Sequence, residues 1–183
     1  MGQYYKAIVL KKSYKNRVNP IEATLDSWEY ANGAKLMEHS YIGNSYVRAA
    51  EELLHYCYNG YPFVWCGDYS DDVDFKKFKG NLYDLAYAHK KNLAIHVTNE
   101  VEYSRYLVNY TKRQYVELKE FVPNKFQIHP LPLLCSDGNG RGGGDYHGNN
   151  MEYVGLWAYN RIGICDKIPD GFKKLDIEFI EEY

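Results

Sequence analysis

The chain has 183 residues, of which 45% are hydrophobic and 25% are charged, a composition typical of one globular domain that can bury a core. Its formal net charge of −2 argues against a protein that binds duplex nucleic acid over a broad basic surface. The polar start MGQYYK does not resemble a signal peptide, and no apolar run reaches membrane-spanning length. We therefore expect a cytoplasmic protein with reduced thiols and no membrane partner.

The first part of the chain predicts strands around one helix. Aromatic and branched residues at 4–14 favour a strand, and the segment KLMEHS at 35–40 is a short strand candidate. Residues 43–60 predict a helix, because Ser45 can cap its start, apolar residues recur at helical spacing, and Gly60 can end it. A further strand then runs into an acidic turn.

The second part is expected to be rich in strands. Residues 77–91 give a weaker helix pattern, and residues 105–118 predict a strand or hairpin. The segment IHPLPLLCS at 128–136 is predicted to be extended, because both of its prolines disfavour helix in the preceding residue. Residues 153–167 favour a long strand or hairpin, and residues 172–183 a closing strand or helix.

Two halves of the chain repeat similar words in the same order. Residues at identical internal offsets correspond: Tyr5, Lys11, Lys12 and Tyr14 match Tyr106, Lys112, Arg113 and Tyr115. Farther on, KLMEHSYIGN is similar to PLLCSDGN, and VWCGD to IGICD. We predict a single α+β domain with a mostly antiparallel sheet and one or two helices, built from pseudo-duplicated halves at about 1–98 and 99–183. A groove between the halves would be a natural ligand site.

Distinctive words are spread along most of the chain: MGQYYK, KLMEHS, GDY, NYTKRQYV, IHPLPLL, GNGRGGGDY and VGLWAYNRI. Together they resemble a widespread set of small bacterial and phage proteins. The words GNGRGGGDY and IHPLPLL are the specific part of this resemblance. It implies a shared fold and a shared site at the glycine-rich segment, and it implies no particular reaction.

The segment DGNGRGGGDYHG at 137–148 is half glycine. Fixing so many glycines costs conformational entropy, which indicates that their backbone freedom is needed. Glycines let backbone N–H groups converge on an anion, Arg141 could add a forked contact to a phosphate, and an aromatic ring could stack on a base. We predict a ligand site composed of Asn139, Gly140, Arg141, Gly142, Gly143, Tyr146, Trp157, Arg161 and Trp65.

Two other interpretations of this segment stay open. As a calcium loop it places Asp137 and Asn139 correctly, but Arg141 and Gly148 stand where such a loop needs oxygen donors. As a structural element it would be a hairpin tip that lets two strands pass closely. The sequence contains no phosphate-loop or dinucleotide fingerprint, and its four cysteines form no CxxC pair. No metal and no cofactor are predicted.

The candidate catalytic groups are His147, Asp145, His39 and Asp68, because a His–Asp pairing can serve general acid–base chemistry. The chain contains no HExxH or HxH spacing for a metal. Ordinary polar residues at strand ends would show the same pattern. The sequence therefore favours a binding protein over an enzyme.

Three functions follow from these patterns. The preferred one is binding or sequestration of a small nucleotide-like anionic ligand, and the resemblance to phage proteins adds the hypothesis of an anti-defence protein that captures an immune signal. The second is an inhibitor whose tyrosine-rich face docks on a host protein, since the chain has 20 tyrosines. The third is a nucleotide or phosphoester hydrolase. Homo-oligomer formation is left open.

Overall fold

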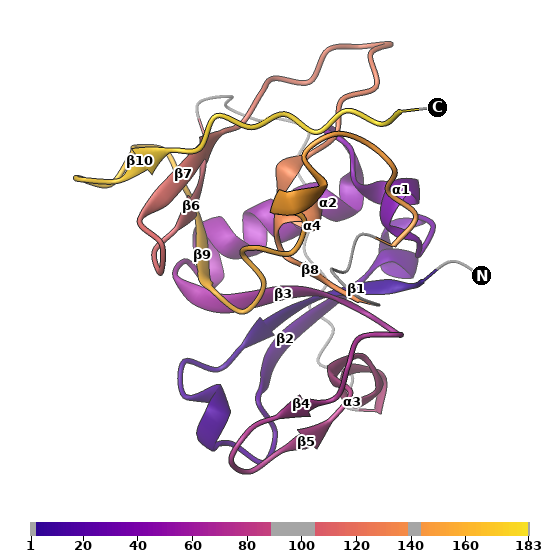
Figure 1. The fold of residues 1–183 in the computed structure, drawn as a ribbon, viewed down its shortest axis with the longest axis vertical. Helices are drawn as coiled ribbons and strands as arrows, with labels where there is room; N and C mark the ends of the chain where they lie inside the picture. Colours follow the sequence, from indigo (N-terminus) through magenta and orange to yellow (C-terminus); the bar gives the residue numbers. More distant parts are fainter. Residues whose placement is uncertain (1–2, 89–104, 139–143, 183) are drawn as a thin grey trace.

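The computed structural model describes residues 3–88, 105–138 and 144–182 of the chain. Within them the chain forms an eight-stranded main sheet and a two-stranded ribbon (Figure 1). The main-sheet strands are β1 (Tyr5–Leu10), β2 (Ile21–Asp26), β3 (Tyr61–Gly67), β6 (Tyr106–Asn109), β7 (Gln114–Glu117), β8 (Ser136–Asp137), β9 (Arg161–Cys165) and β10 (Lys173–Lys174). The ribbon strands are β4 (Val73–Asp74) and β5 (Lys79–Gly80). The α-helices are α1 (Leu36–His39), α2 (Ser45–Glu52), α3 (Leu82–Ala88) and α4 (Pro130–Leu134).

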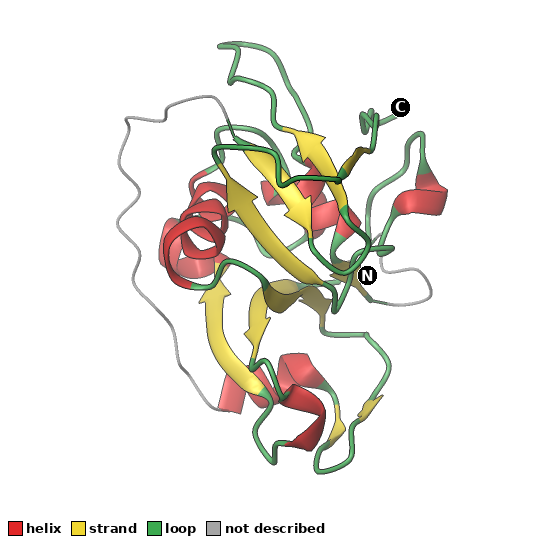
Figure 2. Cartoon of the chain, turned by 90° about the vertical axis from the view of Figure 1, so that its left-hand side faces the viewer, coloured by secondary structure: helices red, strands yellow, loops and turns green. Residues whose placement is uncertain are grey.

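The main sheet has the strand order β10-β7-β6-β9-β3-β1-β2, with β8 paired to β3 beside this path. Its described pairings are antiparallel except for the short pairs β10 with β7 and β8 with β3. Figure 2 shows the strands twisting through the molecule with helices packed beside them. The predicted α+β class with a mostly antiparallel sheet is confirmed. The described residues contain four α-helices rather than one or two.

Two segments predicted to be extended are helical. The prolines of α4 stand at its first and third positions, Pro130 and Pro132, where a helix has no internal partner for the backbone N–H. The imidazole Nδ1 of His129 accepts the Leu131 N–H at 3.1 Å and caps this helix. In α1, the Asp145 carboxylate accepts the Met37 N–H at 3.0 Å. A cap thus overrides the local preference in both segments, from His129 within the segment in α4 and from the distant Asp145 in α1.

Helix α2 confirms the strongest helix pattern of the sequence, with one change at its start. Its cap is Asn44, whose Oδ1 accepts the backbone N–H groups of Tyr46 (2.9 Å) and Val47 (3.3 Å), rather than the predicted Ser45. A π-helical turn, Leu53–Cys57, extends α2, and Gly60 follows with a φ of +80°. The positive φ explains why glycine stands where the chain leaves the helix.

The sheet separates two hydrophobic clusters, because β1 is buried on both faces. Tyr5, Ala7 and Val9 face the larger cluster with α2 and α4, while Ile8 and Leu10 face a smaller one with α3. Figure 1 shows α2 and α4 above β3, and α3 with the β4–β5 ribbon below it.

The two halves contribute similar strand triplets. The β1–β2 hairpin pairs with β3, and the β6–β7 hairpin pairs with β9. Tyr5 lies opposite Gly67 in the first triplet, and Tyr106 lies opposite Cys165 in the second. The triplets join where the first residues of β3 and β9 pair. This arrangement is what two similar halves would give, and their origin by duplication stays a prediction.

Candidate functional site

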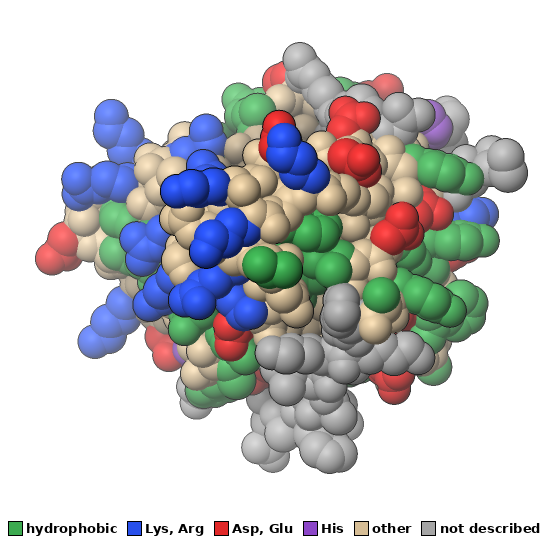
Figure 3. Space-filling model, turned by 90° about the horizontal axis from the view of Figure 1, so that it is seen from below, with side chains coloured by type: hydrophobic (Ala, Val, Ile, Leu, Met, Phe, Trp, Pro, Cys, Tyr) green, Lys and Arg blue, Asp and Glu red, His purple; other side chains and the backbone are tan. Residues whose placement is uncertain are grey.

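Lysine and arginine side chains gather where the two hairpins and the start of β9 meet. Figure 3 shows them in blue on the left of the molecule seen from below, with few acidic side chains among them. We call this surface the basic face, and its described cations are Lys11, Lys12, Lys15, Arg17, Lys112, Arg113, Arg161 and Lys173. The hairpin ends converge because β3 and β9 pair only at their starts, so the ends of β1 and β6 lie on either side of that junction.

Aromatic rings lie between these cations. The Lys12 ammonium is 4.8 Å from the ring centroid of Tyr61. Tyr61 pairs with Ile162 at the β3–β9 junction, next to Arg161. The guanidinium carbon of Arg161 lies 5.6 Å from the ring centroid of Tyr110. These separations are those of cation–π contacts.

The same alternation continues from Tyr110 to the turn before β10. The rings of Tyr110 and Phe172 meet edge to face with centroids 5.8 Å apart. The guanidinium carbon of Arg113 is 5.8 Å from the Phe172 centroid, and the Lys173 N–H donates to the Arg113 carbonyl at 3.0 Å. The contact Lys12–Tyr61 and the series Arg161–Tyr110–Phe172–Arg113 thus lie next to each other at the β3–β9 junction, and we call the row from Lys12 to Lys173 the band.

The cations of the band keep their charge uncompensated. Elsewhere in the described chain, several lysines pair with carboxylates, as Lys119 does with Glu178 at 2.7 Å and Lys79 with Asp74 at 2.9 Å. No described carboxylate pairs with a cation of the basic face. Since the whole chain has a net charge of −2, this face is a local positive region on a slightly acidic protein.

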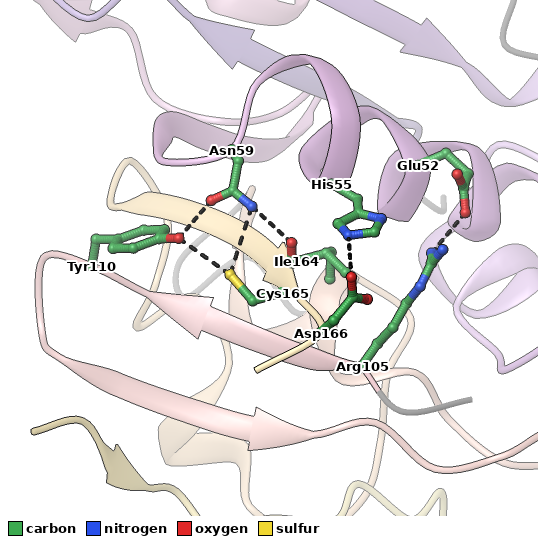
Figure 4. Close-up of polar contacts among 8 residues, drawn as sticks. All are labelled: Glu52, His55, Asn59, Arg105, Tyr110, Ile164, Cys165 and Asp166. Atoms are coloured by element: carbon green, nitrogen blue, oxygen red, sulfur yellow. Dashed lines mark hydrogen bonds and ion pairs between the residues drawn. The ribbon is translucent and has the colours of Figure 1, made fainter. Parts of the chain in front are cut away.

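A polar network beneath the band fixes the Tyr110 ring (Figure 4). The Tyr110 hydroxyl donates to Asn59 Oδ1 at 2.6 Å, and the Cys165 thiol lies 3.2 Å from the same hydroxyl. Asn59 also donates from Nδ2 to the Ile164 carbonyl at 2.7 Å. Burial and the neighbouring thiol raise the pKa of Tyr110, so its phenol stays neutral.

Ion pairs beside this network join the end of α2 to the sheet. Arg105 Nη1 lies 2.6 Å from Glu52 Oε1, and His55 Nε2 lies 3.3 Å from Asp166 Oδ2 (Figure 4). Arg161 is anchored as well, because its Nε donates to the Gly60 carbonyl at 2.9 Å. The Arg161 residue is nevertheless exposed to solvent.

Of the predicted ligand residues, Asn139, Gly140, Arg141, Gly142 and Gly143 lie outside the described residues. Their described neighbours, Gly138 and Gly144, both lie against Tyr5. Burial first, then the nearby carboxylates Asp145, Asp68 and Asp137, raise the pKa of the Tyr5 hydroxyl. The described ends of the glycine segment thus lie near the carboxylates that surround Tyr5.

The close approach of Gly144 to Tyr5 explains why this position is a glycine. Its φ is +56°, and a Cβ there would lie 2.8 Å from the Tyr5 hydroxyl. We expect Gly144→Ala to lower the free energy of unfolding by about 2 kcal/mol, from the left-handed backbone and the contact together. Gly60→Ala shares only the first penalty, since its nearest neighbour atom is 3.4 Å away. Urea denaturation of both variants measures the loss of unfolding free energy. Equal losses would show that the Tyr5 side chain moves away from the new methyl group without cost.

The three predicted aromatic ligand residues are core residues. Trp65 is 0% exposed, while Trp157 and Tyr146 are each 1% exposed. The Tyr146 hydroxyl donates to the Asn149 carbonyl at 2.8 Å, and its ring packs edge to face on Phe179. None of the three presents a ring face to a base in this conformation. Arg161 is the described member of the predicted set that is exposed.

The candidate catalytic groups are held by structural hydrogen bonds. His39 is buried: its Nε2 accepts the Trp65 indole N–H at 3.0 Å, so its Nδ1 carries the proton and donates to the Gly33 carbonyl at 3.0 Å. Burial lowers the pKa of His39 to about 4. Asp145 caps α1, as described above, and Asp68 accepts the Tyr4 N–H at 3.0 Å.

His147, the last of the four, has an exposed side chain. No hydrogen bond among the described residues joins the imidazole of His147 to Asp145 or Asp68. The structure therefore assembles no acid–base pair from these groups. The residues that do share a surface were not predicted as ligand residues. They are Lys12, Tyr61, Tyr110, Arg113 and Phe172. The sequence did single out Lys12 and Arg113, because they stand at matched positions in the two repeated words.

The described part of the chain holds neither a metal-binding cluster nor a membrane-spanning helix. It contains no group of three or more His, Cys, Asp or Glu side chains suited to a metal ion. None of its helices combines the length and apolar character needed to cross a bilayer. Comparison of the chain with protein-family models, curated proteins and solved structures gave no match.

Proposed function

We propose that the protein binds a nucleotide-like anionic ligand through its basic face. The observation that carries this proposal is the alternation of unpaired cations with aromatic rings from Lys12 to Lys173. A phosphate is bound by forked arginine contacts and by lysine point charges. A base needs a flat partner for stacking, which the rings and the guanidinium planes supply.

This proposal keeps the ligand class that the sequence favours and moves it from the glycine segment to the basic face. Arg161 belongs to both descriptions of the site. Hydrolysis has less support, because His39, Asp145 and Asp68 are engaged in structural hydrogen bonds. Binding without turnover needs none of these groups.

The test removes charge from the two ends of the band. We expect Lys12→Gln combined with Arg113→Gln to weaken binding of ATP and pyrophosphate about tenfold, equivalent to about 1.4 kcal/mol, because a phosphate at either end of the band then loses a cationic contact. Isothermal titration calorimetry at low salt measures this effect. Both side chains are exposed, so the fold should persist.

A matched control removes two lysines outside the band. Lys35 and Lys119 are each paired with a carboxylate, Glu38 and Glu178. The variant Lys35→Gln with Lys119→Gln should bind like the wild type. Absence of binding to both anions in the wild type, or equal loss in both double variants, would contradict the proposal.

A further inference from the structure

The basic face is longer than one nucleotide needs. Its cations come from the β1–β2 connection, the β6–β7 turn, the start of β9 and the start of β10. From β1 to β6 the face crosses the β1–β3, β3–β9 and β9–β6 pairings, which at the usual strand separation spans about 14 Å. Lys15 and Arg17 extend it on one side, and Arg113 and Lys173 on the other. One nucleotide could contact only part of this surface.

We infer that the ligand of the basic face is a single strand of nucleic acid, an inference that rests on the proposed function. Proteins that bind single strands combine a positive track for the phosphates with aromatic platforms for successive bases. The series Lys12–Tyr61, Arg161–Tyr110 and Phe172–Arg113 has both components in alternation.

A base would stack on the exposed parts of these rings or on the guanidinium groups that lie over them. Tyr61, Tyr110 and Phe172 are half-buried, which fixes them as rigid platforms. The guanidinium planes of Arg161 and Arg113 lie over two of these rings, and bases stack on guanidinium planes as well as on aromatic rings. The Asn59 and Cys165 contacts beneath Tyr110 hold its platform in place before any ligand arrives.

A single strand fits this surface better than a duplex does. In a duplex the bases are stacked on one another, so rings at the protein surface have no base faces to contact. Broad duplex binding also relies on many phosphate contacts, whereas the chain as a whole has a net charge of −2.

The test uses fluorescence anisotropy with labelled oligothymidylates of about three, six and twelve nucleotides, and oligouridylates of the same lengths. We expect affinity to rise with length until the face is filled, and to fall steeply between about 50 and 200 mM salt. A duplex of the same length should bind at least about tenfold more weakly. Comparison of the DNA and RNA strands shows whether a 2′-hydroxyl contributes.

Aromatic variants separate stacking from charge. Tyr61→Leu and Phe172→Leu each remove a ring and no charge, and we expect about a tenfold loss of oligonucleotide affinity with unchanged pyrophosphate affinity. Thermal unfolding shows that each variant is folded, and the two variants are independent of each other. Oligonucleotide affinity that is unchanged in both would overturn the inference.

Failure of this inference differs from failure of the proposed function. If ATP and pyrophosphate bind but affinity does not rise with strand length, the single-strand inference is wrong and the nucleotide-like ligand remains. A duplex that binds as tightly as the single strand also overturns it. If ATP, pyrophosphate and the oligonucleotides all fail to bind, both proposals are wrong.

Discussion

Removing a single oxygen atom by Tyr46→Phe is expected to lower the free energy of unfolding by about 3 kcal/mol, although the residue stays aromatic. Tyr46 lies on α2 and is 0% exposed. Its hydroxyl accepts the Ala7 N–H at 2.8 Å and donates to the Leu25 carbonyl at 2.9 Å. Ala7 and Leu25 are opposite residues of β1 and β2. The hydroxyl therefore bridges two backbone groups that belong to paired strands.

Phenylalanine would leave both backbone groups buried without this partner, and a buried unsatisfied polar group costs about 1–3 kcal/mol. Urea denaturation monitored by circular dichroism measures the loss. Tyr56→Phe is the matched control, because Tyr56 is 71% exposed and follows α2 in the same helical run. If both variants lose the same small amount, then β1 and β2 close the gap with a direct hydrogen bond.

This role of Tyr46 shows what the sequence could and could not predict about the fold. The helical spacing of apolar residues in α2 and the branched residues of β1 are local signals, and both elements were predicted. The 20 tyrosines also suggested a face that docks on a host protein. Tyr46 has a different use, which depends on a strand pair that meets the helix only in the folded chain.

Helix α4 illustrates a different limit. Its prolines oppose helix formation in general but not within the first turn, and the position of that turn is set by His129 and the buried leucines that follow. The burial of Trp65 and Trp157 has a similar origin. An aromatic residue that could stack on a base could equally fill a core, and only the packing of β3 against α2 and α4 decides between the two.

The net charge does not reveal the basic face, because it sums the charges of the whole chain. A net charge of −2 says nothing of how the charges are distributed, and the positive residues of the two hairpins are about a hundred positions apart. They meet because β3 and β9 pair at their starts, a junction of few residues without a local sequence signature. The matched words at Lys12 and Arg113 predicted equivalent positions in two halves, but not that these positions share a surface.

The stability of the protein is expected to fall as the solution is acidified below pH 6.5, and His39 should account for about 3 kcal/mol of that fall at pH 4. Burial lowers the pKa of His39 to about 4 in the folded protein, against 6.5 for an exposed histidine. Between these two values the unfolded chain binds a proton that the folded chain does not, so acid favours unfolding. The contribution is complete above pH 6.5 and is lost progressively toward pH 4, with about 2 kcal/mol gone at pH 5.

The geometry explains why the folded protein resists this protonation. A proton on Nε2 of His39 would remove the acceptor of the Trp65 indole N–H, which lies 3.0 Å away in the core. The nearby carboxylates Asp145 and Glu38 act in the opposite direction, but burial has the larger effect.

The measurement compares unfolding free energies at pH 7, 5 and about 4 for the wild type, His39→Gln and His147→Gln. Glutamine at position 39 can still accept the indole N–H but does not titrate, so this variant should be less stable at pH 7 and lose less stability on acidification. His147 is exposed, and its variant should follow the wild-type curve. Other groups titrate equally in all three proteins, so the difference between the curves isolates His39. Parallel curves for the wild type and His39→Gln would mean that the folded protein accommodates a charged imidazole beside Trp65, and that the neutral tautomer does not hold this part of the core together.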